Sequence, residues 1–226
     1  MMTPRMIVKC EVFHPDREII KAILFDFGGV LAEEGFRDGL QALARRQGLD
    51  PNRMFEIGMD AVYDSGWVEG RGDEAGFWRL MAERAGLRGD PAAMRETILE
   101  RFKLRPTMLA LVDRLRRRGY RVGLLSDQTE WLDELDRRHG IYRHFDHLYI
   151  SYRLGKGKRD PSLFDDIARD LGLAPDEILF IDDNAANVER ARQRGWHGIV
   201  FTDTDTLLRQ LRRLGIAAGD DKLKAD

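Results

Sequence analysis

The sequence predicts an α/β fold built on a mostly parallel sheet, and two observations lead to this prediction. Short apolar runs of four to six residues recur along the chain, each bounded by polar residues or glycine. Such runs are typical of strands that are covered on both faces. Stretches with a helical spacing of apolar residues lie between most of them, and alternating strands and helices imply right-handed crossovers between parallel strands.

The individual elements follow in chain order. The predicted strands are Ala22–Phe27, Val122–Ser126, His147–Ile150, Ile178–Ile181 and Gly198–Phe201. Two stretches between them carry apolar residues at positions i, i+3, i+4 and i+7, which is the pattern of one buried helix face. These residues are Met108, Leu111, Val112 and Leu115 in the first stretch, and Phe164, Ile167, Ala168 and Leu171 in the second. Gly119 and Gly172 follow where a C-terminal helix cap belongs.

Residues 36–104 interrupt this alternation, because they contain no convincing strand run. They predict helices at Gly39–Gln47, Pro51–Tyr63, Asp73–Ala85 and Pro91–Lys103. Pro51 and Pro91 stand where a first helical turn accepts proline. We therefore expect residues 1–35 and 105–226 to form one α/β core, and residues 36–104 to form an all-helical insertion.

Composition excludes several classes of protein. The 226 residues carry 37 Lys and Arg against 39 Asp and Glu, so the net charge is -2, whereas nucleic acids and anionic membranes favour a basic partner. No apolar run approaches the ~18 residues of a membrane span, and the start of the chain lacks the apolar stretch of a signal peptide. Cys10 is the single cysteine, which excludes an internal disulfide. We expect a cytoplasmic protein that binds neither nucleic acid nor membrane.

Polar residues follow the predicted strands at the point where each strand ends. Asp26 ends the first strand, Ser126 and Asp127 end the second, and Asp182 and Asp183 end the fourth. Open parallel sheets bind ligands beyond the carboxyl ends of their strands. Carboxylates gathered at one such edge repel each other unless a cation joins them, and their hard oxygen atoms favour Mg²⁺.

A lysine and several glycines complete the set. Lys158 precedes a predicted helix and can bring a positive charge to the same edge, while Gly28 and Gly29 let a substrate approach the backbone closely. A carboxylate, a divalent cation, a hydroxyl group and a lysine together are suited to phosphoryl transfer, in which positioning and charge neutralisation provide most of the catalysis.

Four segments in this order resemble the motifs of the haloacid dehalogenase-like superfamily of hydrolases, of the type with a helical cap inserted after the first strand. They are LFDFGGVL at 24–31, LLSD at 124–127, GKGKRDP at 155–161 and LFIDDNAANV at 179–188. One such motif alone is weak, whereas four in order on the expected strands form a specific signal. The resemblance covers residues 23–201 and implies a Rossmann-like core.

The resemblance also implies roles for individual residues. Asp26 is expected to be the nucleophile that forms an aspartyl-phosphate. The second oxygen of Asp26, the Gly28 carbonyl, Asp182 and Asp183 are expected to hold Mg²⁺. Ser126 and Lys158 are expected to bind the phosphoryl group, with Gly28, Gly29 and Asp127 also facing the substrate. The cap at 36–104 is expected to close over the site and select the substrate.

Two positions depart from the family pattern. Phosphatases of the superfamily usually carry a second Asp two positions after the nucleophile, as general acid and base, and here that position is Gly28. Glu33 and Glu34, just downstream, are candidate substitutes. Asp127 stands where Asn is usual, and we hypothesise that its extra charge turns toward Arg159 or Lys156.

These patterns predict a magnesium-dependent phosphatase or phosphotransferase that acts on a small phosphorylated metabolite, for which a sugar phosphate is one candidate. One alternative is a 2-haloacid dehalogenase with Asp26 as nucleophile, which has no use for a metal. Another is a degenerate, non-catalytic binding protein, suggested by Gly28 and Asp127. We expect a monomer or a homodimer, with Ile7–Phe13 as an added edge strand or a dimer contact.

Overall fold

A five-stranded parallel sheet forms the centre of the computed structural model, which describes residues 20–216. The strand order is β3-β2-β1-β4-β5, and every neighbouring pair is parallel. The strands are β1 (Ala22–Phe25), β2 (Arg121–Ser126), β3 (His147–Ile150), β4 (Ile178–Asp182) and β5 (His197–Val200). The predicted α/β class is thereby confirmed. The segment Ile7–Phe13 and Cys10 lie outside the described residues.

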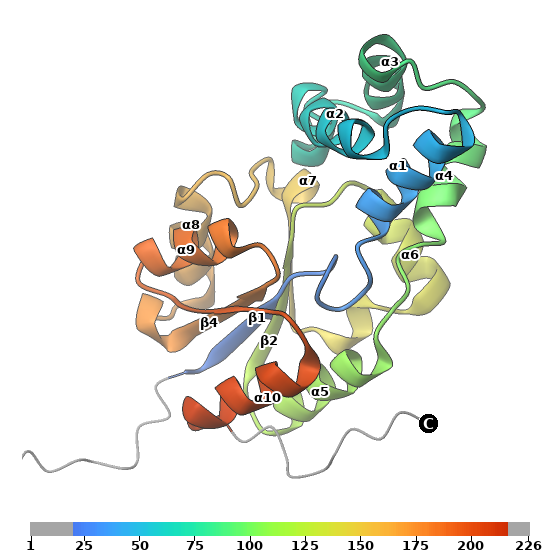
Figure 1. Ribbon diagram of the computed structural model, residues 1–226. Coiled ribbons are helices and arrows are strands. Elements are labelled where there is room, and N and C mark those ends of the chain that lie inside the picture. Colours follow the sequence, from blue (N-terminus) through green and yellow to red (C-terminus); the bar gives the residue numbers. More distant parts are fainter. Residues whose placement is uncertain (1–19, 217–226) are drawn as a thin grey trace, which may run out of the picture.

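Helices cover both faces of the sheet, as the unbroken apolar strands require. Successive residues of a strand point to opposite faces, so Leu24 and Phe25 of β1 belong to two separate apolar clusters. One face packs against α5 (Pro106–Arg117), α6 (Trp131–His139) and α10 (Thr204–Arg213), and the other against α8 (Ser162–Leu171) and α9 (Ala185–Gln193). Figure 1 shows α8 and α9 on one side of the strands and α5 and α10 on the other. The short elements are η2 (Tyr142–His144), α7 (Ser151–Leu154) and η3 (Pro175–Glu177).

Only helices lie between β1 and α5 within this described part of the chain. They are α1 (Gly35–Arg46), α2 (Pro51–Asp64), η1 (Trp67–Glu69), α3 (Glu74–Ala85) and α4 (Pro91–Leu99), and Figure 1 shows them grouped at one end of the molecule. Pro51 and Pro91 begin their helices, as their positions predict. The prediction for α4 was too long: the chain turns after Leu99, where Phe102 and Lys103 donate to the carbonyls of Leu99 and Arg101.

The chain enters and leaves this helical segment at neighbouring points. Ala32 forms isolated β-bridges with both Gly28 and Leu104. The backbone N–H of Glu33 donates to the carbonyl of Lys103 at 2.9 Å, and that of Arg105 donates to Leu31 at 2.8 Å. The two segments that connect the helical segment to the rest of the chain therefore lie side by side at the carboxyl edge of the sheet.

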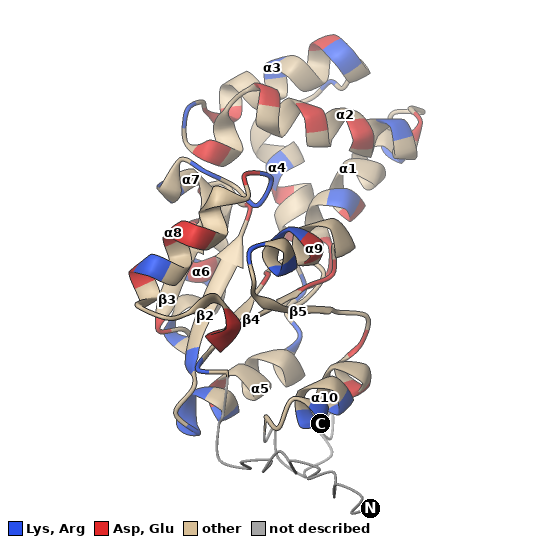
Figure 2. Cartoon of the chain, turned by 90° about the vertical axis from the view of Figure 1, so that its left-hand side faces the viewer, with Lys and Arg blue, Asp and Glu red and all other residues tan. Residues whose placement is uncertain are grey.

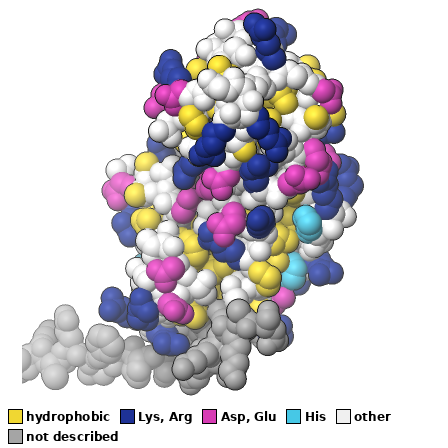
Figure 3. Space-filling model, turned by 45° about the vertical axis from the view of Figure 1, so that its right-hand side comes forward, with side chains coloured by type: hydrophobic (Ala, Val, Ile, Leu, Met, Phe, Trp, Pro, Cys, Tyr) yellow, Lys and Arg dark blue, Asp and Glu magenta, His cyan; other side chains and the backbone are white. Residues whose placement is uncertain are grey.

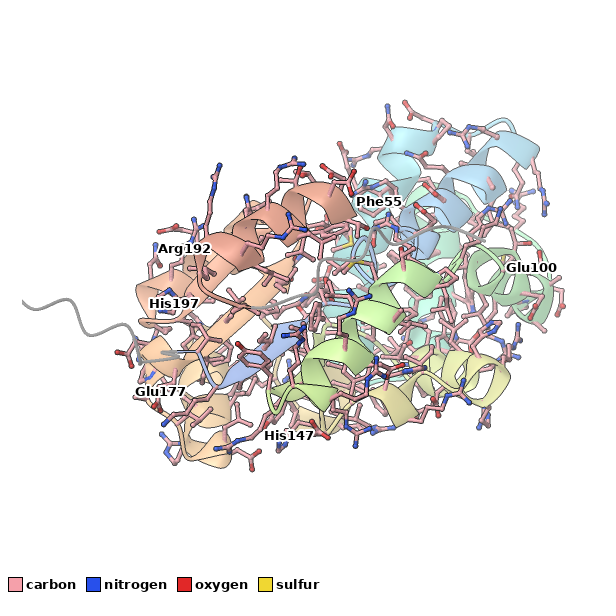
Figure 4. All side chains as sticks on the ribbon, turned by 90° about the horizontal axis from the view of Figure 1, so that it is seen from below. Phe55, Glu100, His147, Glu177, Arg192 and His197 are labelled. Atoms are coloured by element: carbon pink, nitrogen blue, oxygen red, sulfur yellow. The ribbon has the colours of Figure 1, made fainter. Side chains whose placement is uncertain are left out.

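The helical segment faces the carboxyl edge of the sheet, where ligands of parallel sheets bind. Figure 4 shows the other edge, where His147, Glu177 and His197 mark the beginnings of β3, β4 and β5, on the far side from Phe55 of α2. Charged residues of both signs are interspersed over the elements in Figure 2, in keeping with the near-zero net charge. None of the helices in residues 20–216 is both long and apolar enough to cross a membrane.

Candidate active site

The polar residues of the candidate site lie at the carboxyl ends of three adjacent strands. Asp26 directly follows β1, and its N–H still donates to the Ile181 carbonyl of β4 at 2.9 Å. Ser126 is the last residue of β2, and Asp182 is the last residue of β4. Because β1 lies between β2 and β4, these three side chains meet at one edge, as their positions after the apolar runs predict.

The carboxylate of Asp26 is held by donors on both oxygens. Its Oδ1 accepts hydrogen bonds from the Ser126 hydroxyl and from the Phe27 N–H, each at 2.7 Å. Its Oδ2 lies 2.9 Å from the ammonium nitrogen of Lys158. Burial raises the pKa of Asp26 to about 8, while the charge of Lys158 opposes that rise. Ser126 and Lys158 favour the ionised form that a nucleophile needs, but burial outweighs them, so a cation beside Asp26 would be required to hold that form.

Lys158 joins two carboxylates across the sheet edge. The side chain is 2% exposed, and its Nζ donates to Oδ2 of Asp182 at 2.7 Å as well as facing Asp26. Burial by itself lowers the pKa of Lys158, but the charges of Asp182 and Asp26 outweigh burial and raise it. The lysine therefore stays charged, and breaking the triad would leave a buried charge unpaired, which is strongly destabilising.

Asp26, Asp182 and Asp183 form the cluster that suits a metal ion among the described residues. One oxygen atom from each lies within 4.8 Å of the others. Burial and the charge of Asp182 raise the pKa of Asp183, which is the electrostatic cost that a divalent cation would remove. The donors are all carboxylate oxygens, which fit Mg²⁺ and do not fit a soft metal.

Two glycines make room for this arrangement. A Cβ atom on Gly29 would lie 2.2 Å from Oδ2 of Asp183, and Gly29 has a φ of +76°, so both space and backbone conformation favour glycine. A Cβ atom on Gly28 would lie 2.5 Å from Oε1 of Glu34. The Glu34 carboxyl group thus fills the space beside residue 28.

The two candidate substitutes for a general acid differ sharply in their surroundings. Glu33 is half exposed and forms an ion pair with Arg105 at 3.1 Å. Glu34 lines the same pocket as Asp26 and Lys158, and its nearest cation in the described part is Arg37 at 3.9 Å. Burial, followed by the charge of Asp183, raises the pKa of Glu34. Of the two residues, only Glu34 lines that pocket.

The charge of Asp127 is stabilised by other partners than the two cations of our hypothesis. Its Oδ1 accepts a hydrogen bond from the backbone N–H of Lys158 and its Oδ2 accepts one from the Tyr63 hydroxyl, both at 2.8 Å. Lys156 pairs instead with Asp166, and Arg159 stacks on the Tyr63 ring with Cζ at 3.5 Å from its centroid. The extra carboxylate is therefore stabilised by two hydrogen-bond donors, without a direct ion pair to either cation.

A pocket of about 420 Å³ opens above these residues, a volume suited to a small molecule. Its floor includes Asp26, Ser126, Lys158 and Asp183. The helical segment supplies apolar and aromatic walls, which are Phe36, Phe55, Met59, Val62, Tyr63, Trp67 and Val68. Acidic and basic side chains lie close together on the face shown in Figure 3.

Several pocket residues were missed in the sequence. Asn187 donates to Oδ2 of Asp182 at 3.1 Å, and its position one helical turn beyond Asp183 is a signal that could have identified it. Arg190 donates to Asn187 at 2.9 Å and lines the pocket. Tyr63 and Arg37 carry no local signal, because their approach to the core depends on how the helical segment packs.

Comparison with known proteins places the chain in a family. The family model of the haloacid dehalogenase-like hydrolases matches residues 20–195, which is more than half of the chain. A D-ribitol-5-phosphate phosphatase of Bacteroides thetaiotaomicron is 25% identical over 194 residues, covering 79% of this chain and 90% of the relative. The family resemblance read from the four motifs is thereby confirmed.

Two further matches are a longer protein and a solved structure that shows the fold alone. The bifunctional epoxide hydrolase 2 of Sus scrofa is 26% identical over 219 residues. That alignment covers 86% of this chain but only 39% of the relative, so this chain spans less than half of the relative's length. A haloacid dehalogenase family enzyme of Bacteroides thetaiotaomicron, crystallised with magnesium and inorganic phosphate, superposes with a TM-score of 0.65 at 23% identity. That superposition covers 84% of this chain and all of the other.

Proposed function

The chain belongs to the haloacid dehalogenase-like hydrolases, and from that premise we propose that it is a magnesium-dependent phosphatase acting on a small phosphorylated metabolite. The observation that carries the proposal is the Asp26–Lys158–Asp182 triad, with Asp183 beside it, on the floor of a small-molecule pocket. A dense carboxylate cluster of this kind has a chemical use chiefly as a cation site next to a phosphoryl group.

In the proposed reaction Asp26 is the nucleophile. A carboxylate oxygen of Asp26 forms a bond to phosphorus while the bond between phosphorus and the alcohol oxygen breaks, which gives an aspartyl-phosphate. Water then attacks phosphorus and releases inorganic phosphate together with the free carboxylate. Ser126 and Lys158 are proposed to hold the phosphoryl oxygens, since both already donate to Asp26.

The carboxylates of Asp26, Asp182 and Asp183, with the Gly28 carbonyl, are proposed to hold Mg²⁺. When bound, the ion neutralises the charge on the phosphoryl oxygens and on the carboxylate cluster. Glu34 is proposed to give the leaving oxygen its proton and later to accept one from the attacking water, because its carboxyl group lies beside Gly28, where the family usually has an Asp.

Residues 36–104 are proposed to form a cap over a core of residues 1–35 and 105–226. The pocket is lined from both sides, by Phe55 and Tyr63 of α2 and by Asp26 and Ser126 of the sheet. A site enclosed in this way excludes water other than the reacting molecule and lets the cap side chains select the substrate.

The test is phosphate release by the purified chain from 4-nitrophenyl phosphate, with Mg²⁺ or with EDTA. We expect turnover with Mg²⁺, loss of turnover with EDTA, and no turnover for Asp26→Asn, which removes the nucleophile but keeps the side-chain shape. Equal rates for wild type and Asp26→Asn would refute the proposal. Chloride release from 2-chloropropionate in EDTA would favour the dehalogenase alternative, in which Asp26 attacks carbon instead. Cation binding without turnover across a panel of phosphate esters would favour a non-catalytic binding protein.

A further inference from the structure

Three arginines from separate parts of the chain line the pocket. Arg37 lies in α1, Arg159 lies in the loop before α8, and Arg190 lies in α9. The proposed phosphoryl site on the floor is already served by Ser126, Lys158 and the carboxylate cluster. These arginines therefore form a second basic group in the same 420 Å³ cavity.

Two of the arginines are held against aromatic rings of α2. The Cζ atom of Arg159 lies 3.5 Å from the centroid of the Tyr63 ring, and that of Arg37 lies 4.9 Å from the centroid of Phe55. A guanidinium group that stacks through its face keeps its N–H donors in the plane of the group, free for hydrogen bonds at its edge. Both rings line the pocket, so the stacking fixes the arginines at its wall.

The charges of these arginines are only weakly compensated by protein carboxylates. Within residues 20–216, Arg159 and Arg190 have no carboxylate oxygen within 4.0 Å, and Arg37 reaches Glu34 only at 3.9 Å. Lys156, close to Arg159 in the chain, is by contrast paired with a carboxylate, since its Nζ lies 2.6 Å from Oδ2 of Asp166. Arg159 is thus presented to the pocket with its charge available for a ligand.

We propose that the substrate carries a second anionic group on its alcohol portion, and that Arg159 binds this group. The inference rests on the proposed phosphatase function and deepens it, since it names the substrate class as a phosphate monoester of an acid. A carboxylate and a second phosphate share the chemistry that a guanidinium fork recognises, which is paired oxygen acceptors in one plane.

The experiment compares esters that differ in this second group. The carboxylate pair is 3-phosphoglycerate and glycerol 3-phosphate, and the phosphate pair is fructose 1,6-bisphosphate and fructose 6-phosphate. With Mg²⁺ present, we expect kcat/KM to be at least about tenfold higher for the doubly anionic member of one pair, as a charge-assisted hydrogen bond supports. The pair that shows the preference identifies the second group as a carboxylate or a phosphate.

Variants then assign the preference to Arg159. In Arg159→Gln the ratio of the two kcat/KM values should fall toward one, mainly through KM, and Arg159→Lys should recover part of it because it keeps the charge. Arg169→Gln is the matched control: Arg169 is exposed on α8, pairs with Asp166 at 3.0 Å and does not line the pocket, so the ratio should stay at the wild-type value.

The outcomes separate the two proposals. Phosphate release from all four esters with ratios near one would overturn this inference and leave the phosphatase function standing. A preference that survives Arg159→Gln would also overturn it, as would release of phosphate from 4-nitrophenyl phosphate but from none of the four esters. No release from any of the four esters or from 4-nitrophenyl phosphate would overturn the phosphatase function and this inference with it.

Discussion

The Glu34 carboxyl group occupies the space that a side chain at position 28 would fill. Oε1 of Glu34 lies 2.5 Å from where a Cβ atom on Gly28 would be, so a carboxyl group lies beside residue 28, two positions after the proposed nucleophile, although residue 28 has no side chain. Glu34 reaches this place because it is the N-cap residue of α1, at the start of the helical segment. A bulkier residue at position 28 would collide with it.

The proposed acid role makes the rate depend on the leaving group. Glu34→Gln removes the proton but keeps the shape, so kcat/KM for glycerol 3-phosphate, whose alkoxide is a poor leaving group, should fall by about 10²–10⁴-fold. The kcat/KM for 4-nitrophenyl phosphate reports phosphoryl transfer and not the later attack of water, and its leaving group needs no proton, so it should fall by less than about tenfold. Steady-state kinetics on both esters measure the difference.

Glu33→Gln is the control, since Glu33 is half exposed and pairs with Arg105 at 3.1 Å. Its rates should match those of wild type on both esters. An equal loss of kcat/KM on both esters for Glu34→Gln would argue for a structural role of Glu34 and against proton transfer to the leaving group.

At the scale of elements, α2 is the helix that brings Phe55 and Tyr63 to the pocket. Its start is fixed by two residues: Pro51 occupies the first turn, and the Asp50 side chain accepts hydrogen bonds from the N–H groups of Asn52 and Arg53 at 2.8 and 3.1 Å. Both features were readable in the sequence, because a helix start is encoded locally.

Removing this cap should destabilise the protein measurably. Asp50→Ala is expected to lower the free energy of unfolding by about 1 kcal/mol, because two backbone donors of α2 lose their acceptor. Urea unfolding, followed by circular dichroism, measures the change. Asp60→Ala, on an exposed position of the same helix, should change stability by less than about 0.5 kcal/mol. Equal losses in the two variants would contradict the capping role.

The contacts between these elements also show which features could not be predicted from the sequence. Asp26, Ser126, Asp182 and Asp183 could be placed together because each follows an apolar run, and parallel strands end at one edge. The hydrogen bond from Tyr63 to Asp127 could not be predicted, because it joins residues from two elements whose relative rotation is set by side-chain packing. The start of α1 was also predicted late, since the helix begins at Gly35 and not at Gly39.

At the scale of the whole molecule, Trp67 is one of three aromatic residues of the helical segment that pack against Trp131 of α6. Its ring is 1% exposed and packs edge-on against Trp131 of α6, with centroids 4.8 Å apart. Its Nε1 donates to Glu130 at 2.6 Å. Nearby, the Ser151 hydroxyl donates to the carbonyl of Val68 at 2.6 Å, so apolar and polar contacts act at the same junction.

Substitution of Trp67 should therefore weaken the whole fold. Trp67→Ala is expected to cost about 3–5 kcal/mol of unfolding free energy through the cavity it leaves. Trp67→Phe should cost less, about 1–3 kcal/mol, because it keeps an aromatic ring but leaves Glu130 without its donor. Urea unfolding of both variants checks the order. Leu154→Ala serves as the control, since Leu154 is 43% exposed. Wild-type stability in Trp67→Ala would show that the junction contributes little.

The paired connections at Ala32 and Leu104 affect how the protein can change in evolution. Since the chain leaves the sheet and returns to it through hydrogen-bonded neighbours, the ends of the helical segment are already joined, and closing the gap without that segment needs only a short turn. The segment can therefore change in length while the strand register and the carboxylates of the floor stay in place. Under the proposed function, the residues that react and the residues that select the substrate are thus encoded in separate stretches of the gene, and a new substrate range can arise without a change at Asp26.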